Sequence, residues 1–159
     1  MYHESDYETI KAQIKRRSLL MLSVCFLLLI PAVIGIIAHF NRNESLTWMT
    51  YLFLLMMGVF ILFADGLFVS PLRAYKRHLN NVLHGLTATL HGRFKTLDKT
   101  VCIRDNVAFY PLIINVGDMH NEEDDRLFYF DILKPFPPLS EGEAVVVISH
   151  DKGVADINP

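Results

Sequence analysis

Two long apolar runs separated by a short polar segment dominate the first half of this 159-residue chain. The run 18–40 contains no Asp, Glu, Lys or Arg, and the run 48–70 contains only Asp65. At about 1.5 Å of rise per residue each run would form a helix about 34 Å long, enough to cross a hydrocarbon layer about 30 Å thick. An amphipathic helix of a soluble protein would have a polar face, and neither run has one. The pattern therefore predicts a transmembrane helical hairpin over residues 18–70.

The residues before this hairpin predict a further helix. In residues 1–17, Ser5 and Glu8 have the spacing of a capping box, and apolar residues then recur on one helical face with basic residues around the other. We expect an amphipathic lead-in helix on the cytoplasmic side of the membrane. A frayed and solvated tail is the alternative.

A short basic helix is predicted over residues 71–85, directly after the hairpin. Ser70-Pro71 is typical of a helix start, with serine as the cap and proline at the first helical position, and Gly85 is typical of a helix end. A short basic helix beside the membrane suits the anionic inner leaflet. We therefore expect its basic side chains to act as an orientation anchor at the membrane surface: Arg73, Lys76 and Arg77.

From Leu86 onward the pattern changes from helical to alternating, which indicates a β domain over residues 86–159. Asp105-Asn106 is a turn candidate, His91-Gly92 predicts a bulge or bend, and Pro111 predicts a sheet edge or a bend. No helical pattern interrupts the β segments, so they predict a small barrel, SH3-like or OB-like, with a small β-sandwich as the alternative. The fold class is then an α+β membrane protein, a two-helix transmembrane hairpin followed by a small all-β cytoplasmic domain. The expected strands lie within residues 86–97, 99–104, 106–116, 126–133, 143–149 and 154–157.

The distribution of basic residues predicts the orientation. Lys and Arg gather before the first span and after the second, whereas the loop between the spans contains only Arg42. The positive-inside rule then places both termini and the β domain in the cytoplasm, with the hairpin in the plasma (inner) membrane. The glycosylation sequon Asn43-Glu44-Ser45 lies in this short loop, and we interpret it as a chance match.

Asp65 is the single acidic residue within a predicted span. A carboxylate inside a membrane is costly and needs a partner. In an antiparallel hairpin the cytoplasmic end of the first span lies at a similar depth, so we expect Asp65 to pair with Arg16 or Arg17, or with a partner subunit. Contact with another membrane protein and an ion- or proton-conducting role are the alternatives.

The most polar stretch of the β domain is residues 117–125. Its spacing fails the EF-hand pattern, because there is no glycine at the sixth position and no glutamate at the twelfth. We interpret it as an acidic hairpin loop that could meet a basic partner. The alternative is a divalent cation held by two or three of the alternating side chains Asp118, His120, Glu122 and Asp124.

Aromatic residues of the β domain offer a candidate contact surface. Phe128 and Phe130 share one face of a predicted strand and should belong to the core, whereas Tyr129 faces the opposite way. If the barrel leaves that second face open, Tyr129 and Phe136 would form a patch for a protein partner. Core packing is the alternative for these side chains.

Few features of the sequence point to chemistry. Ser149-His150-Asp151 contains the residues of a hydrolase triad, but consecutive residues point in alternating directions and cannot align in the required order. Cys25 and Cys102 lie in different environments, which argues against a disulfide or a cysteine-based metal site. The β domain has more acidic than basic residues, whereas nucleic-acid sites need a basic groove with exposed aromatics. We therefore expect no enzyme activity, no cofactor and no nucleic-acid partner.

These observations favour a non-enzymatic, membrane-anchored adaptor or accessory subunit of a membrane protein complex. Its partners would be the lipid bilayer and another membrane protein or further copies of the chain. An oligomeric channel or transporter component is the alternative, and a metal- or ligand-sensing membrane-anchored barrel is the third hypothesis.

The order of a membrane hairpin and then a small β domain is loosely similar to that of NfeD-type membrane proteins. The residues that carry the similarity are Gly142, Val145, Val147, Gly153 and Ile157. Many hairpins that close a barrel share this pattern, so we take no function from it.

Overall fold

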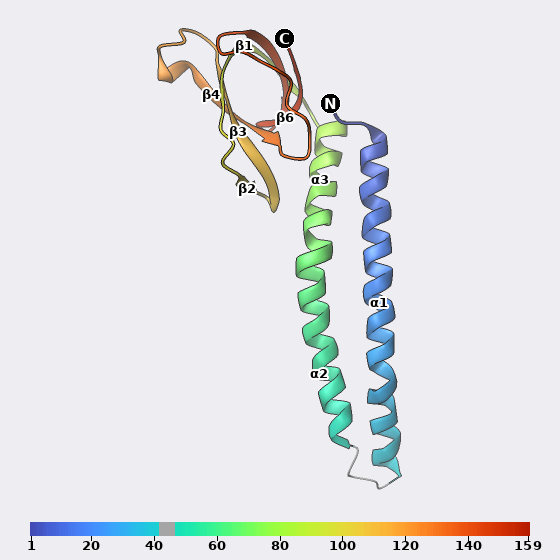
Figure 1. Cartoon of the computed structure of the whole chain (residues 1–159). Helices are drawn as coiled ribbons and strands as arrows, with labels where there is room; N and C mark the ends of the chain where they lie inside the picture. The colour runs from blue at the N-terminus through green and yellow to red at the C-terminus, as the bar shows by residue number, and fades with distance from the viewer. Residues whose placement is uncertain (42–46) are drawn as a thin grey trace. The chain divides into compact units, whose positions relative to one another are not determined.

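The computed structural model describes residues 1–41 and 47–159, and the chain divides into two compact units (Figure 1). The helical unit comprises Ile10–Arg73, and the barrel unit comprises Met1–Thr9 together with Ala74–Pro159. The sequon Asn43-Glu44-Ser45 and Arg42 lie outside the described residues.

Helix α1 covers Glu4–Phe40, so the predicted lead-in helix and first span are one continuous helix. Its start differs from the predicted capping box at Ser5. The Asp6 side chain reaches back one turn, so its Oδ2 accepts from the His3 N–H (3.1 Å). The Asp6 N–H in turn donates to the His3 carbonyl (2.9 Å).

The second long helix consists of three consecutive parts. Helix α2 covers Thr47–Ala64, a π-helical turn η2 covers Asp65–Val69, and α3 covers Ser70–His84. Both long helices, α1 and the helix from α2 to α3, are long and apolar enough to cross a membrane by length and composition. Large apolar side chains point outward along both, as at Leu62, which is 78% exposed.

The prediction that a new helix starts at Ser70-Pro71 is wrong, because the helix continues through both residues. Proline lacks an N–H and cannot donate to the carbonyl four residues earlier. The wider π turn directly before it accommodates this defect, and the Ser70 N–H donates to the Asp65 carbonyl, five residues back. The predicted end is confirmed, since α3 stops at His84 and the Gly85 N–H donates to the Asn81 carbonyl (2.8 Å).

The β domain has six strands and one 3₁₀ turn, and five of the strands close into a barrel (Figure 1). The hydrogen-bonded order is β1-β5-β6-β4-β3-β2, and an additional pairing of β1 with β3 closes it. Strand β2 extends β3 as a hairpin outside the ring, and β4 and β6 pair in parallel through Tyr129 and Gly153. The elements are β1 (Ala88–Leu97), β2 (Cys102–Arg104), β3 (Val107–Asn115), η3 (Glu122–Asp124), β4 (Asp125–Asp131), β5 (Ala144–His150) and β6 (Gly153–Asn158).

This closure confirms the predicted barrel, and the sandwich alternative is wrong. After β1, β3 and β4, the chain returns so that β5 lies beside β1, which is a Greek-key connection. A five-stranded Greek-key barrel is the architecture of OB folds. Of the two barrel types expected, the strand order therefore fits the OB-like one.

The structure confirms one of the three predicted irregularities. Asp105 and Asn106 form the β2–β3 turn with φ of 52° and 64°, as a tight hairpin turn requires. The predicted sheet edge at Pro111 is wrong, because Pro111 lies inside β3 opposite Tyr129 of β4. Its carbonyl accepts from the Asp98 N–H (2.9 Å) just beyond the end of β1, so its missing donor interrupts no pairing. The predicted bulge at His91-Gly92 is wrong, because the register shift of β1 lies between Phe94 and Thr96.

Glycine is required at position 92 for a reason other than the predicted bulge. A Cβ atom there would lie 2.6 Å from Ile114 Cγ2 and 2.7 Å from the Asn115 carbonyl oxygen. Glycine is therefore needed because the backbones of β1 and β3 approach closely where the barrel closes.

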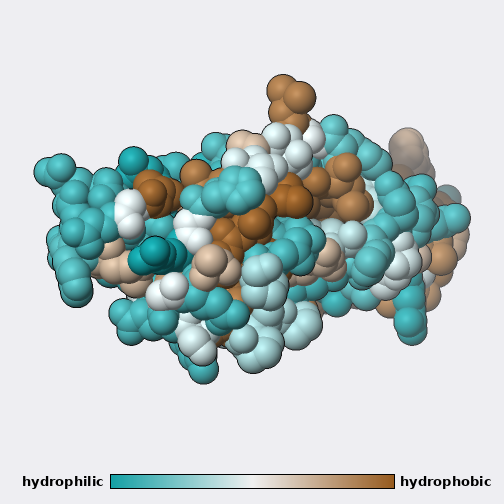
Figure 2. Space-filling view, turned by 90° about the horizontal axis from the view of Figure 1, so that it is seen from above, coloured by the Kyte–Doolittle hydropathy of each residue, from teal (hydrophilic) through white to brown (hydrophobic). Residues whose placement is uncertain are grey.

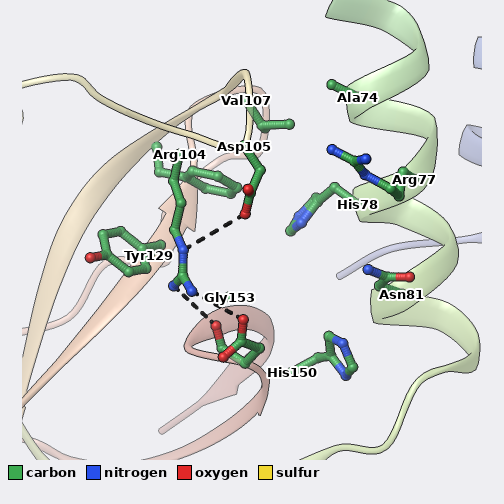
Figure 3. A pocket seen from close by; sticks show the side chains of 12 residues that line it. Ala74, Arg77, His78, Asn81, Arg104, Asp105, Val107, Tyr129, His150 and Gly153 are labelled. Atoms are coloured by element: carbon green, nitrogen blue, oxygen red, sulfur yellow. Dashed lines mark hydrogen bonds and ion pairs between the residues drawn. The ribbon is translucent and has the colours of Figure 1, made fainter.

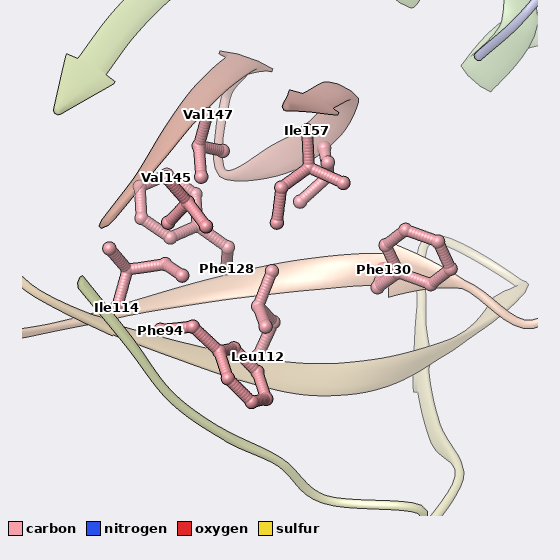
Figure 4. Packing of buried hydrophobic residues seen from close by; sticks show 9 residues of the cluster. Phe94, Leu112, Ile114, Phe128, Phe130, Val145, Val147 and Ile157 are labelled. Carbon is pink, nitrogen blue, oxygen red and sulfur yellow. The ribbon is translucent and has the colours of Figure 1, made fainter. Parts of the chain in front are cut away.

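The barrel encloses one hydrophobic core, to which β1, β3, β4, β5 and β6 all contribute (Figure 4). Phe128 and Phe130 are both buried, as their shared face predicts. Seen from above, the surface is mostly hydrophilic, and apolar residues gather across the middle of the view (Figure 2). The buried core residues are Phe94, Leu112, Ile114, Phe128, Phe130, Val145, Val147, Val154 and Ile157.

Candidate functional site

A polar cleft of about 260 Å³ lies within the barrel unit, between α3 and two β turns (Figure 3). Helix α3 forms one wall, and the opposite wall comes from the β2–β3 and β5–β6 turns with part of β4. The lining residues are Ala74, Arg77, His78, Asn81, Arg104, Asp105, Val107, Phe109, Tyr129, His150, Asp151 and Gly153.

The amphipathic pattern of α3 positions its side of the cleft. Leu79 and Val82 are buried on the face that packs inward. Ala74, Arg77, His78 and Asn81 have the i, i+3, i+4, i+7 spacing that places side chains on a common helical face. That face lines the cleft.

Two histidine–glycine contacts connect α3 with the β5–β6 hairpin. The His78 ring packs against Gly153, where an added Cβ would lie 3.3 Å from His78 Cε1. The His150 ring packs against Gly85, where an added Cβ would lie 2.6 Å from both Cε1 and Nδ1. His150 Nδ1 also lies 2.8 Å from the Leu86 carbonyl, to which its N–H can donate. The two glycines thus allow both imidazoles to approach the backbone closely.

Arg104 is fixed in the opposite wall. Its Nη2 lies 3.0 Å from Asp151 Oδ2, its Nη1 donates to the Asp151 carbonyl (3.2 Å), and its Nε lies 3.9 Å from Asp105 Oδ2. The guanidinium also lies over the Tyr129 ring, 5.0 Å from its centre. The two carboxylates of the turns therefore more than balance the positive charge of Arg104.

Arg77 differs, because within the described residues its exposed guanidinium has no hydrogen bond or ion pair. The basic group predicted for the membrane surface is thus divided among three environments. Arg73 pairs with Asp65 (3.1 Å), the Lys76 ammonium lies 5.3 Å from the centre of the Tyr7 ring, and Arg77 lines the cleft. Their shared role as an orientation anchor stays a prediction.

A buried polar cluster lies beside the cleft. Asp131 is 0% exposed, and its Oδ2 accepts from the hydroxyl groups of Tyr75 (2.6 Å) and Tyr2 (3.1 Å). His78 packs edge-on against Tyr2 and Phe109, with ring centres 5.9 and 5.1 Å apart. The cluster attaches the N-terminal residues and α3 to strand β4.

The environment of this cluster keeps its ring side chains neutral at physiological pH. Burial raises the pKa of both Tyr2 and Tyr75, and the nearby Asp131 carboxylate raises them further. Burial lowers the pKa of His78, although Asp131 partly opposes that shift. A neutral imidazole between neutral phenols is a stable packing element of a domain interior.

Sequence reasoning missed this cluster because its members are far apart in the chain. Tyr2 and Asp131 are separated by 129 positions, and Tyr75 and Asp131 by 56. One signal could have found it. Asp131 directly follows Phe128-Tyr129-Phe130 at the end of an apolar strand, and a carboxylate buried there needs hydrogen-bond donors from other parts of the chain.

The structure does not assemble the alternative metal site of the acidic loop. Asp118 Oδ1 accepts from the His120 N–H (3.1 Å), and Asp124 Oδ2 accepts from the Asp118 N–H (3.0 Å), so both carboxylates serve the loop itself. Glu122 lies in the 3₁₀ turn η3. Within the described residues no three His, Cys, Asp or Glu side chains gather where they could hold a metal ion.

The predicted partner of Asp65 is wrong. Asp65 pairs with Arg73 rather than with Arg16 or Arg17, and Arg17 instead donates to the Phe68 carbonyl (3.0 Å). In a regular α-helix two residues eight positions apart are rotated by about 80° from each other. The π turn reduces the rotation per residue and brings Arg73 round to the face of Asp65.

The predicted contact pair Tyr129 and Phe136 is also not a free patch. Tyr129 is half-buried beneath Arg104, and Phe136 packs on the core, with ring centres 5.0 Å from Phe130 and 5.7 Å from Phe94. The core-packing alternative therefore describes Phe136. The exposed apolar residues at the sheet edge are Val101 and Ile103, which sequence reasoning counted as strand residues only.

Comparison of the chain with protein families, with curated proteins and with solved structures found no match in any of the three.

Proposed function

We propose that this protein is a non-enzymatic, membrane-anchored adaptor or accessory subunit of a membrane protein complex, whose β domain makes the protein contacts. The observation that carries the proposal is where its exposed apolar side chains lie: most line the two long helices, and two more, Val101 and Ile103, lie at the edge strand β2. Such surfaces indicate lipid or protein partners.

The helices support the membrane part of the proposal. Side chains such as Leu62 would each leave apolar surface in contact with water, at about 25 cal/mol per Å². A bilayer removes this cost. Basic residues lie before the apolar run of α1 and after α2, and under the positive-inside rule they support a cytoplasmic location for both termini and the β domain.

The edge strand β2 supports the protein-contact part. It pairs only with β3 among the described strands, so its other side offers free backbone donors and acceptors. Ile103 within the strand is 76% exposed, and Val101 just before it is 51% exposed. An apolar strand edge of this kind can accept an extended segment of a partner as a further strand.

The polar interior supports a non-enzymatic role. The buried carboxylate of Asp131 is occupied by hydrogen bonds from Tyr2 and Tyr75, as in a structural network. The channel alternative is less favoured, because the Asp65 carboxylate that would face a conduction path is paired with Arg73.

The test is photo-crosslinking in native membranes, with a photoreactive amino acid at position 103 and, as the matched control, at Thr89, which is exposed on β1. We expect a crosslinked adduct from position 103 and none from position 89. The adduct mass separates a second copy of the chain from a different protein. No adduct from position 103, or equal adducts from both positions, would overturn the proposal.

A further inference from the structure

The polar cleft beside α3 contains one arginine that makes no hydrogen bond or ion pair among the described residues. Arg104 is neutralised by Asp151 and Asp105 within the cleft wall. Arg77, on the facing wall, has no such partner within the described residues (Figure 3). The two arginines and two aspartates of the lining sum to no net charge, but both aspartates lie on the wall of Arg104, so the free positive charge lies at the side of Arg77.

The groups near Arg77 are hydrogen-bonding side chains. Asn81 lies one helical turn further along α3, on the same face, and its amide can donate. Figure 3 shows His150 at the same end of the cleft as Asn81. The Arg104 guanidinium is held rigidly by Asp151 and Tyr129, so this wall needs little rearrangement to receive a ligand.

The size of the cleft limits the ligand. A cavity of about 260 Å³ lies just below the usual range for drug-sized ligands, which begins at about 300 Å³. It admits a small molecule or a single headgroup. A planar guanidinium with free donors recognises tetrahedral oxyanions through paired hydrogen bonds.

We propose that this cleft binds the phosphate group of a phosphomonoester, with Arg77 contacting the phosphate oxygens in a bidentate manner and the Asn81 amide donating beside it. The phosphate can belong to a soluble metabolite or to the headgroup of a phospholipid such as phosphatidic acid. This inference goes beyond the proposed adaptor function, and crosslinking at position 103 does not depend on it.

The experiment uses the full chain, ¹⁵N-labelled and reconstituted in phosphatidylcholine nanodiscs. Glycerol 3-phosphate is titrated while the side-chain amide signal of Asn81 is followed by NMR. In a second arm the nanodiscs contain increasing mole fractions of phosphatidic acid and no soluble ligand. Arg77→Gln is compared with Arg93→Gln, an exposed arginine on β1 outside the cleft.

We expect a saturable shift of the Asn81 signal that Arg77→Gln weakens by about tenfold or more, as the loss of a charge-assisted contact predicts, and that Arg93→Gln leaves within about twofold. A shift with glycerol 3-phosphate identifies a soluble phosphate, and a shift only with phosphatidic acid identifies a lipid headgroup. No shift in either arm, or a shift that Arg77→Gln does not weaken, would overturn the proposal. Because Arg77 is exposed, its substitution should leave the amide spectrum of the barrel core unchanged.

Discussion

The helical unit and the barrel unit place their apolar side chains in opposite ways. In the helical unit large side chains such as Leu62 point outward, whereas in the barrel unit Leu112 is 0% exposed at the centre of a closed core. Charged groups do not follow this division, because both units contain ion pairs: Asp65 with Arg73 in the helical unit, and Arg104 with Asp151 in the barrel unit. The barrel unit also buries the Asp131 carboxylate, which accepts hydrogen bonds from two tyrosine hydroxyls.

This difference teaches that the exposed fraction of a side chain has meaning only for a given solvent. In water the hydrophobic effect drives apolar groups inward, as in the barrel. Lipid tails are as apolar as leucine, so a helix in a bilayer gains nothing by hiding its apolar side chains. The outward apolar side chains of the helical unit are therefore what the proposed membrane location predicts, and the closed core of the barrel is what water predicts.

The largest expected effect lies in the barrel core. We expect Phe130→Ala to lower the free energy of unfolding of the barrel unit by about 3–5 kcal/mol, because it removes a fully buried ring and leaves a cavity. Amide hydrogen exchange of the β strands in detergent micelles measures this. Leu127→Ala, on the exposed side of the same strand, is the control and should change stability by less than about 0.5 kcal/mol.

Replacing an exposed apolar residue with lysine should distinguish a side chain that faces lipid from one that faces water. Leu27→Lys in α1 should oppose membrane insertion by about 3 kcal/mol, because a charge is placed within the apolar span. Ile103→Lys on β2 should leave insertion and barrel folding unchanged, although Ile103 is also exposed. The recovered membrane fraction after an alkaline wash measures insertion. Equal recovery of the two variants would contradict the comparison.

The buried cluster should give an intermediate effect. Tyr75→Phe removes one hydrogen bond to the Asp131 carboxylate and should destabilise the barrel unit by about 1.5–3 kcal/mol, as expected for bonds to charged groups. The matched control is Tyr110→Phe. Tyr110 is a half-buried residue of β3, and its substitution should change stability little. Unfolding in increasing denaturant, monitored by hydrogen exchange of β4, distinguishes them.

The smallest effect is a pH dependence from His78. Its pKa is lowered in the folded protein, so between that value and about 6.5 the unfolded chain binds more protons than the folded one. The stability of the barrel unit should therefore be fully present above about pH 6.5 and fall as the pH drops through the folded pKa. One proton limits the slope to about 1.4 kcal/mol per pH unit.

Thermal unfolding between pH 7.5 and 5.0 checks this dependence, since the carboxylates with lowered pKa values titrate below that range. His78→Leu should remove most of the slope, whereas His91→Gln, on the exposed side of β1, should keep it. An unchanged slope in His78→Leu would assign the dependence to another group.

Local patterns in the sequence predicted much of the fold correctly. The alternation of Phe128 and Phe130 identified core positions, Asp105-Asn106 identified a hairpin turn, and Gly85 identified the end of α3. Each of these depends on residues within a few positions of one another. Backbone conformation and the buried side of an element are set locally, so periodicity is sufficient to predict them.

The candidate site could not be predicted in the same way. Arg77 was assigned to a membrane-facing basic group, yet α3 places it in a cleft formed with turns at Asp105 and Asp151. The pairing of Asp65 was also missed, because it depends on a π turn that no local pattern indicates. These contacts depend on how elements pack, and a helical or alternating period does not contain that information.

The sequence by itself determined that two segments are long and apolar enough to cross a membrane and that much of the rest alternates into a small β domain. Only the tertiary structure decided that β1 pairs with β3 to close the barrel, that Tyr2 and Tyr75 meet Asp131, and that Arg77 is left without a partner among the described residues. The physical reason is that solvent preference is a property of each segment, whereas a polar site exists only where closure brings distant side chains within hydrogen-bonding distance.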